Sequence, residues 1–276
     1  MKEETIKKAV RESYAKVATG NSCGCDSNSG SCCSQIDQAK EISENMGYSK
    51  EELEKLPEGA NLGLGCGNPI ALASLKKGEI VLDLGSGAGI DCFLAAEKVG
   101  AEGKVIGVDM TPEMLDKARE NIVKSNYKNI EFRLGEIENL PVADNFIDIV
   151  ISNCVINLAS DKERVFLEAF RVLKSGGRIM VSDIVLLNEL PEIIKKDMAA
   201  YVSCVSGAIM KDSYLNSIES AGFSNVKINE ETNFPLDYIL GDKTAFIVKN
   251  KLNLSEKQIK DLENTVVSIK VSAIKQ

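Results

Sequence analysis

The chain has 276 residues, of which 44% are hydrophobic and 27% charged, as in an ordinary globular protein. This length suits one large α/β domain with a small additional lobe, and a core of that size needs no disulfide to hold it. The formal net charge of −8 disfavours nucleic acid as a partner, because phosphate binding requires clustered lysine and arginine.

The first part of the chain, residues 1–58, is predicted to be a helical and cysteine-rich segment. Residues 3–18 and 35–46 show helical periodicity. Ser49 and Glu52 then form a capping-box signal for a further short helix. The loop between the first two helices lacks periodicity and is rich in Gly, Ser, Asn and Cys, with cysteines at Cys23, Cys25, Cys32 and Cys33.

The central region alternates predicted strands and helices. We expect strands at 79–85, 104–110, 129–134, 146–153 and 178–184, and helices at 89–99, 112–124 and 161–173. Thr111 is the expected cap of the helix that starts at Pro112, and Gly176-Gly177 is the expected turn into the last of these strands. Apolar strands that alternate with helices are typical of a doubly wound, mostly parallel sheet.

The C-terminal part is predicted to complete this sheet. Residues 191–200 and 211–221 favour helices, and two later segments, 225–231 and 266–275, favour an antiparallel pair at the sheet edge. Residues 237–263 are expected to be largely helical. We therefore divide the chain into the N-terminal segment, a cofactor-binding domain over 59–190, and a C-terminal region over 191–276.

A glycine-rich turn follows the first predicted strand and indicates a nucleotide-type site. Asp83 ends the strand, and Gly85, Gly87 and Gly89 let the backbone take φ > 0 and approach a ligand closely. Asp109 ends the next strand, 20 residues beyond Gly89, where a carboxylate can accept both hydroxyls of a ribose.

The eight cysteines are expected to be reduced, because we find no targeting segment or membrane span and predict a cytoplasmic protein. Cys66 lies between two glycines before the first strand, Cys154 just past the fourth strand, and Cys204 beyond the fifth. Cys154 is equally suited to a ligand site and to a buried strand end. Cys92, inside the helix after the glycine turn, is expected to be a core residue.

Six motifs occur together in the order GLGCGNP, LDLGSGAGIDC, GVDMTPEML, SNCVINL, RVLKSGGRIMVSDI and SCVSGA. Over roughly residues 60–210, the chain resembles the arsenite methyltransferases, a family of class I S-adenosylmethionine-dependent methyltransferases with a Rossmann-like seven-stranded sheet. The resemblance implies that S-adenosylmethionine binds at Asp83, Gly85, Ser86, Gly87, Gly89, Asp109, Met110, Glu136, Ile137 and Asn153. It also implies that Cys66, Cys154 and Cys204 bind arsenite or methylarsenite as As(III).

The same resemblance implies a redox cysteine near the first helix, for which we favour Cys32 or Cys33, and a thiol reductant such as thioredoxin or glutathione as co-substrate. The chain has no histidine, which excludes a histidine base, and an As(III) lone pair attacks a methyl group without losing a proton. Soft As(III) also prefers thiolates. The expected function is arsenic detoxification. The alternatives are a quinone-like C-methyltransferase and a non-catalytic metalloid-binding protein.

Overall fold

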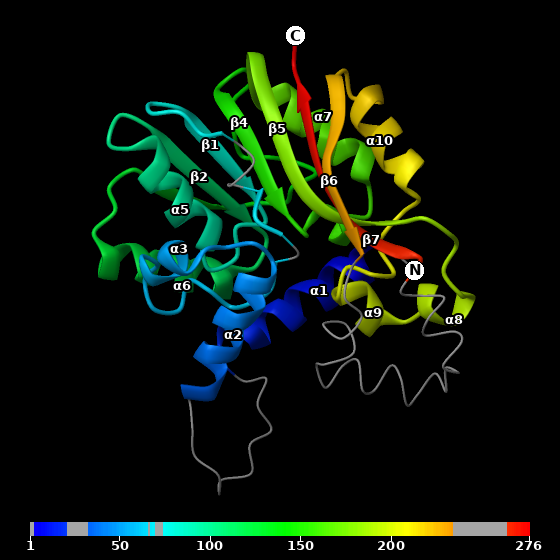
Figure 1. The fold of residues 1–276 in the computed structure, drawn as a ribbon, viewed down its shortest axis with the longest axis horizontal. Coiled ribbons are helices and arrows are strands. Elements are labelled where there is room, and N and C mark those ends of the chain that lie inside the picture. The colour runs from blue at the N-terminus through cyan, green and yellow to red at the C-terminus, as the bar shows by residue number, and fades with distance from the viewer. Residues whose placement is uncertain (1–2, 21–32, 66, 70–73, 234–263) are drawn as a thin grey trace, which may run out of the picture.

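The computed structural model describes residues 3–20, 33–65, 67–69, 74–233 and 264–276 (Figure 1). Its helices are α1 (Glu3–Ala18), α2 (Cys33–Asn45), α3 (Lys50–Glu54), α5 (Ile90–Val99), α6 (Pro112–Ser125), η1 (Ile156–Leu158), α7 (Lys162–Val172), α8 (Glu192–Lys195), α9 (Met198–Val202) and α10 (Lys211–Ser220). Its strands are β1 (Ile80–Leu84), β2 (Lys104–Asp109), β3 (Ile130–Leu134), β4 (Ile147–Asn153), β5 (Leu173–Leu186), β6 (Ser224–Asn233) and β7 (Val266–Ile274). The helix expected within 237–263 lies outside the described residues.

Within the described ranges, seven strands form one sheet in the order β3-β2-β1-β4-β5-β7-β6. Strands β1 to β5 are all parallel to one another, whereas β7 is antiparallel to both β5 and β6. The doubly wound fold with an antiparallel edge, expected from the alternation of strands and helices, is thus confirmed. From β1 the chain adds β2 and β3 on one side of this strand, and it then returns to place β4 and β5 on the other side. The strand order therefore reverses between β1 and β4.

Helices cover both faces of the sheet (Figure 1). On one face, α5 and α6 bury Phe93 and Leu115 against apolar side chains such as Val105 of β2. On the other face, α7 and α10 bury Phe166 and Tyr214, whose rings meet edge to face with centroids 5.4 Å apart. Burial on both faces explains why the parallel strands are continuous apolar runs.

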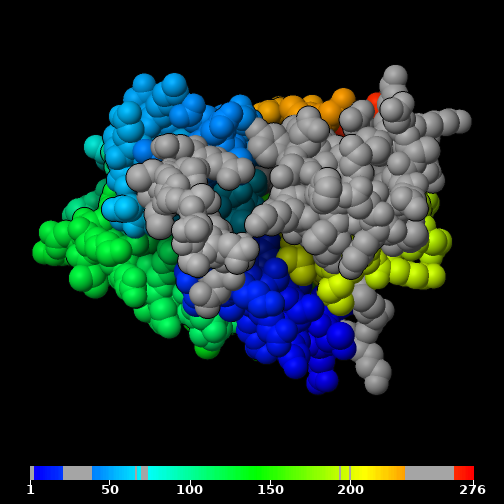
Figure 2. Space-filling view, turned by 90° about the horizontal axis from the view of Figure 1, so that it is seen from below, coloured from blue at the N-terminus to red at the C-terminus, as the bar shows by residue number. Residues whose placement is uncertain are grey.

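The helix α1 lies below the carboxyl ends of the parallel strands in Figure 1. It contacts α9, and Figure 2 shows the two surfaces next to each other. Its side chains Ile6 and Val10 are buried in a cluster that also contains Cys154, Cys204 and Leu158. The apolar stripe expected on the first helix therefore packs against the edge of the sheet where ligands bind in such folds.

Two predicted boundaries were wrong. The strand expected at 178–184 extends over Leu173–Leu186, because the expected Gly176-Gly177 turn is itself paired: Gly176 N–H donates to Lys275 O at 2.8 Å and Lys275 N–H donates to Gly177 O at 2.9 Å. The helix expected at 191–200 is two short helices, since the Asp197 carboxylate accepts the Ala200 N–H at 2.9 Å and begins a new helix.

The capping predictions had mixed outcomes. Ser49 and Glu52 form the expected capping box at α3. Thr111 occupies the cap position of α6, but its side chain makes no capping hydrogen bond. The Thr111 N–H instead donates to Asp109 at 2.8 Å, which ties this residue to the end of β2. None of the helices in the described part of the chain is both long enough and apolar enough to cross a membrane.

Candidate active site

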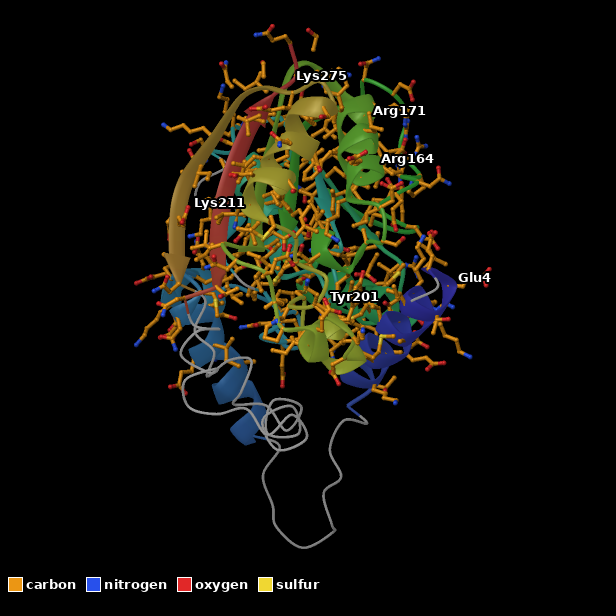
Figure 3. The ribbon with its side chains drawn as sticks, turned by 90° about the vertical axis from the view of Figure 1, so that its right-hand side faces the viewer. Glu4, Arg164, Arg171, Tyr201, Lys211 and Lys275 are labelled. Carbon is orange, nitrogen blue, oxygen red and sulfur yellow. The ribbon has the colours of Figure 1, made fainter. Side chains whose placement is uncertain are left out.

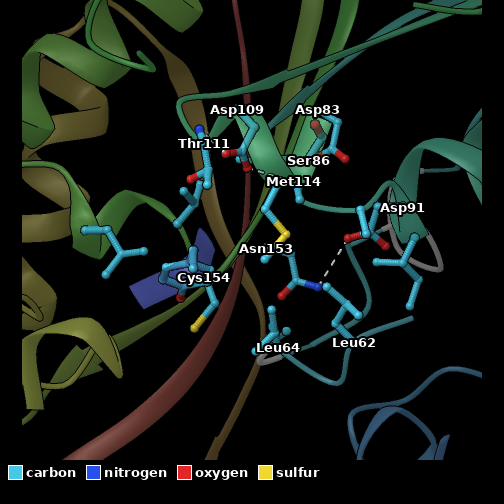
Figure 4. A pocket seen from close by; sticks show the side chains of 18 of the residues that line it. Leu62, Leu64, Asp83, Ser86, Asp91, Asp109, Thr111, Met114, Asn153 and Cys154 are labelled. Carbon is cyan, nitrogen blue, oxygen red and sulfur yellow. Dashed lines mark hydrogen bonds between the residues drawn. The ribbon is translucent and has the colours of Figure 1, made fainter. Parts of the chain in front are cut away.

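A crevice opens where the topology reverses between β1 and β4. It measures about 1120 Å³, counting the solvent space at its mouth. Of the residues predicted to bind the cofactor, those that line it are Asp83, Gly85, Ser86, Gly87, Asp109, Met110, Ile137 and Asn153, and Cys154 joins them (Figure 4). Gly89 and Glu136 do not line it.

The glycine turn between β1 and α5 has the left-handed backbone that its composition predicts. The φ angle is 67° at Gly85 and 52° at Gly87. A Cβ at Gly85 would lie 2.3 Å from Cγ2 of Val155, the residue after Cys154, whereas a Cβ at Gly87 would meet nothing within 4 Å. Gly89 packs instead against Phe132, 2.8 Å from the place of its absent Cβ. The structure thus gives Gly89 a packing role, and its contact with the cofactor stays a prediction.

Three carboxylates surround the inner end of the crevice (Figure 4). Burial raises the pKa of Asp83 well above its ordinary value, and the neighbouring Asp91 raises it further, while the Cys92 thiol donates a hydrogen bond to it at 3.2 Å. Burial also raises the pKa of Asp109, against hydrogen bonds from the N–H groups of Thr111 and Gly87 at 2.8 and 2.9 Å. Cys92 is fully buried, which confirms it as a core residue.

Two of the predicted arsenic-binding residues are in contact beside this crevice: Cys154 lines it, and the Cys204 thiol touches the backbone of Cys154. Cys154 and Cys204 are 50 residues apart, and the Cys204 Sγ–H donates to the Cys154 carbonyl oxygen at 2.9 Å. Their side chains are buried, with 7% and 4% exposed. Both residues have a positive φ, 58° and 65°, which is uncommon outside glycine and concentrates at functional sites.

The third predicted thiol, Cys66, lies outside the described residues, and so do Cys23, Cys25 and Cys32. Cys33 begins α2, but its side chain is not among those described. The glycines on either side of Cys66 are described. A Cβ at Gly65 would lie 2.6 Å from Asn153 Nδ2, and one at Gly67 would lie 2.0 Å from Ser182 Oγ. The backbone of Ser182 in turn accepts the Cys154 N–H at 2.8 Å. Both glycines therefore pack against the strand ends that hold Cys154.

The structure adds crevice residues that sequence reasoning missed, among them Lys7 and Tyr14 of α1, Tyr48, Asp91 and Glu138. The Lys7 Nζ lies 2.7 Å from Glu136 and 3.3 Å from Glu138. Burial disfavours the charged form of Lys7, but the carboxylates of Glu136, Glu3 and Glu138 together outweigh this effect and raise the lysine pKa. Glu136 thus serves to anchor α1. The one available signal for Asp91 was its position two residues after the last glycine of the turn.

Behind the thiols, Asp183 on β5 is completely buried. Burial raises its pKa to about 7, although it accepts hydrogen bonds from Ile184 N–H at 2.9 Å, Asn157 Nδ2 at 2.8 Å and Tyr214 OH at 3.1 Å. The nearby Tyr201 on α9, visible below the sheet in Figure 3, donates to the carbonyl of Leu158 at 3.4 Å. These bonds join η1, α9 and α10 into a support for the segment after Cys154.

A doubly wound sheet with this strand order, a glycine turn after β1 and an acidic residue at the end of β2 defines a nucleotide-type α/β enzyme fold. The family model described as a methyltransferase domain matches residues 75–222, more than half of the chain. The chain belongs to this methyltransferase domain family.

Two similar relatives are arsenite methyltransferases. That of Halobacterium salinarum is 50% identical over 244 residues, covering 85% of this chain and 62% of the relative. That of Aquipseudomonas alcaligenes is 35% identical over 231 residues, covering 81% and 63%. The chain therefore spans about three fifths of the length of these curated relatives.

Among solved structures, an arsenic(III) S-adenosylmethionine methyltransferase from Chlamydomonas reinhardtii aligns with a TM-score of 0.63 at 31% identity. The alignment covers 87% of this chain and 73% of that protein. The resemblance inferred from the six motifs thus agrees with relatives found by sequence and by structure.

Proposed function

We propose that this protein transfers methyl groups from S-adenosylmethionine to trivalent arsenic held by cysteine thiolates. The observation that carries the proposal is the meeting of Cys154 and Cys204, which are distant in sequence, beside the crevice of a methyltransferase fold. Relatives and a solved neighbour named for this activity support it. The substrate in this proposal is arsenite or methylarsenite.

The proposed acceptor site consists of Cys66, Cys154 and Cys204. Arsenic(III) is soft and prefers sulfur to oxygen or nitrogen ligands. Binding displaces the thiol protons, so three neighbouring cysteines can hold the metalloid without a preformed charge. The packing of Gly65 and Gly67 against Asn153 and Ser182 supports the assignment of Cys66, since both glycines adjoin it in the chain.

The crevice residues fit S-adenosylmethionine. The buried Ser86 hydroxyl lines the crevice and has no hydrogen-bond partner among the described residues, which suits a polar ligand group. In this proposal Asp109 accepts the ribose hydroxyls, the open space beside Gly87 admits close backbone contact, and Ile137 offers an apolar surface for the adenine. When bound, the cofactor supplies an electrophilic methyl group on a positively charged sulfonium.

In this mechanism the protein orients the reactants and excludes water. The arsenic lone pair has no proton to lose, so the chain needs no general base, in keeping with its lack of histidine. In their ionised form Asp83, which is buried, and Asp109, which is half-buried, favour a cationic ligand over the neutral product, and a bound cation in turn opposes the rise in pKa that burial gives both groups. The helix α1, anchored by Lys7, covers the crevice from the side of the thiols.

Methyl transfer leaves the arsenic pentavalent, and its return to the trivalent state takes two electrons. We propose that two protein thiolates supply them and become a disulfide, with Cys66 paired to Cys32 or Cys33. A thiol reductant such as thioredoxin or glutathione then gives two electrons and two protons and restores both thiols. The biological role in this proposal is arsenic detoxification.

The test is to incubate the protein with arsenite, S-adenosylmethionine and a thiol reductant and to separate the arsenic species by chromatography. We expect methylated arsenic from the wild type and none from Cys154→Ser or Cys204→Ser. Cys92→Ala is the control for arsenite binding measured without cofactor, because Cys92 packs in a different cluster from Cys154 and Cys204. Asp116→Asn, at an exposed position outside the crevice, is the control for methyl transfer and should keep full activity. Full activity of Cys154→Ser would refute the thiolate model.

The same assay separates the two alternative functions. A quinone-like C-methyltransferase would bind the cofactor and leave arsenite unmethylated in the presence of all components. A non-catalytic binding protein would retain arsenite on its cysteines without consuming S-adenosylmethionine. Either result would contradict the proposal.

A further inference from the structure

A polar network joins the start of α5 to the end of β4. Asp91 lies in the first turn of α5, and its side chain is buried with 3% exposed. Its Oδ1 accepts the Tyr48 hydroxyl at 2.8 Å, and its Oδ2 accepts Asn153 Nδ2 at 3.2 Å, the bond drawn as a dashed line in Figure 4. Asn153 is the residue directly before Cys154. One carboxylate therefore contacts both the cofactor crevice and the strand end that carries a thiol.

The same amide reaches the segment on the other side of the crevice. Asn153 Nδ2 donates to the Gly67 carbonyl oxygen at 2.6 Å, and it lies 2.6 Å from the place where a Cβ would stand on Gly65. Only glycine leaves room for this approach. The amide of Asn153 is thus enclosed by Asp91, Tyr48 and two glycines of one short segment.

We propose that Asp91 is a positioning residue: its carboxylate fixes the side-chain amide of Asn153, which locks the backbone beside Cys154 against Gly65 and Gly67. This inference rests on the proposed function for its catalytic consequence, because these backbones adjoin Cys154 and Cys66. The Asn153 Nδ2 also donates to the Tyr48 hydroxyl at 2.9 Å, and this hydroxyl donates to Asp91. The carboxylate, which only accepts, therefore holds the NH₂ group of Asn153 both directly and through Tyr48. A displacement of about 1 Å at reacting groups can cost roughly 100-fold in rate.

The state of Asp91 depends on pH within an accessible range. Burial raises its pKa to about 6, against hydrogen bonds from Tyr48 and the Asn153 amide. The other charged or titratable groups that act on it are Glu52 of α3, Asp83 of β1 and Cys92 of α5. Because the pKa is raised, the carboxylate that holds the amide prevails above about pH 6, and protonation below that pH removes an acceptor.

The primary test follows the Asn153 side-chain amide by ¹⁵N-edited NMR, with the resonance assigned by its absence in Asn153→Ala. We expect its shift to titrate with a midpoint near pH 6 in the wild type and to be flat in Asp91→Asn. Asp148→Asn is the matched control, because Asp148 lies on β4 like Asn153 but near the opposite end of that strand, where its carboxylate accepts the Ile80 N–H at 2.8 Å. This control should keep the titration. An unchanged titration in Asp91→Asn would overturn the inference.

The second test measures arsenite methylation at saturating arsenite and cofactor between about pH 5 and 8. We expect kcat of the wild type to fall below about pH 6, and Asp91→Asn to lose this limb and run roughly 100-fold slower at neutral pH. The control variant keeps the limb. Equal rates for Asp91→Asn and the control would refute the positioning role. Absence of methylation by the wild type, with the NMR result as expected, would refute the proposed function and leave the network intact.

Discussion

Replacement of Gly85 by alanine tests whether the glycine turn and the thiol segment are mechanically joined. The new Cβ meets Val155 at 2.3 Å from Cγ2, 2.6 Å from Cβ and 3.0 Å from Cγ1. Ordinary van der Waals contact begins at 3.4 Å, so Val155 must move by about 1 Å. Since Val155 follows Cys154 directly, that movement passes into the proposed arsenic site.

The expected cost has two parts. Alanine at a φ of 67° carries a backbone penalty of roughly 1–2 kcal/mol. Overpacking against Val155 adds roughly 1–3 kcal/mol. Gly87→Ala is the matched control, because Gly87 has a φ of 52° in the same turn and open space around its absent Cβ. It should show the backbone penalty alone.

Urea denaturation of both variants measures these costs, and arsenite binding without cofactor measures the consequence at the thiols. We expect Gly85→Ala to lose about 2–5 kcal/mol of stability and to bind arsenite more weakly, and Gly87→Ala to lose about 1–2 kcal/mol with arsenite binding unchanged. The double variant Gly85→Ala/Val155→Gly should recover part of the loss. Equal effects of the two single variants would refute the steric argument.

Three further substitutions probe the fold. Asp183 has a raised pKa of about 7, so the stability contributed by its protonated form is complete below the ordinary pKa of 3.8 and is lost as pH rises through 7. The stability of Asp183→Asn relative to the wild type should therefore increase by up to about 3 kcal/mol between about pH 5 and 8 in thermal unfolding. The exposed-site variant Asp116→Asn should show no such increase. Ser49→Ala removes the α3 capping box and should cost about 1 kcal/mol in urea denaturation; no change would show that α3 is held by packing alone. Arg171, labelled in Figure 3, donates hydrogen bonds to the buried Glu168 carboxylate and to the carbonyls of Leu140 and Val142, and Arg171→Met removes them. The midpoint of urea denaturation should shift by an amount worth about 2 kcal/mol, and a shift near zero would mean that solvent replaces those bonds.

Local patterns predicted the framework of the fold well. The continuous apolar strands identified a doubly wound sheet, and Ser49 with Glu52 identified a helix start, because both features are set by residues close in sequence. The extension of β5 could not be predicted in this way. It depends on pairing of Gly176 with Lys275, about 100 residues later.

The candidate site shows the same division. The glycine turn and Asp109 are contiguous motifs, and the structure places them at the crevice. The contact between Cys154 and Cys204 requires the fold, and only the resemblance to a family linked these residues beforehand. Asp91 and Lys7 escaped notice because their partners, Asn153 and Glu136, lie 62 and 129 residues away.

The placement of β7 has a consequence for the newly synthesised chain. This strand lies between β5 and β6, and within the described sheet β6 pairs with β7 alone. On the ribosome, β5 and β6 are both made before the strand that joins them. Until β7 is in place, each presents unpaired backbone N–H and C=O groups, and such open edges recruit strands from other chains. Variants that weaken β7 should therefore first reveal themselves as aggregation of newly made protein, before any loss of activity in the folded fraction.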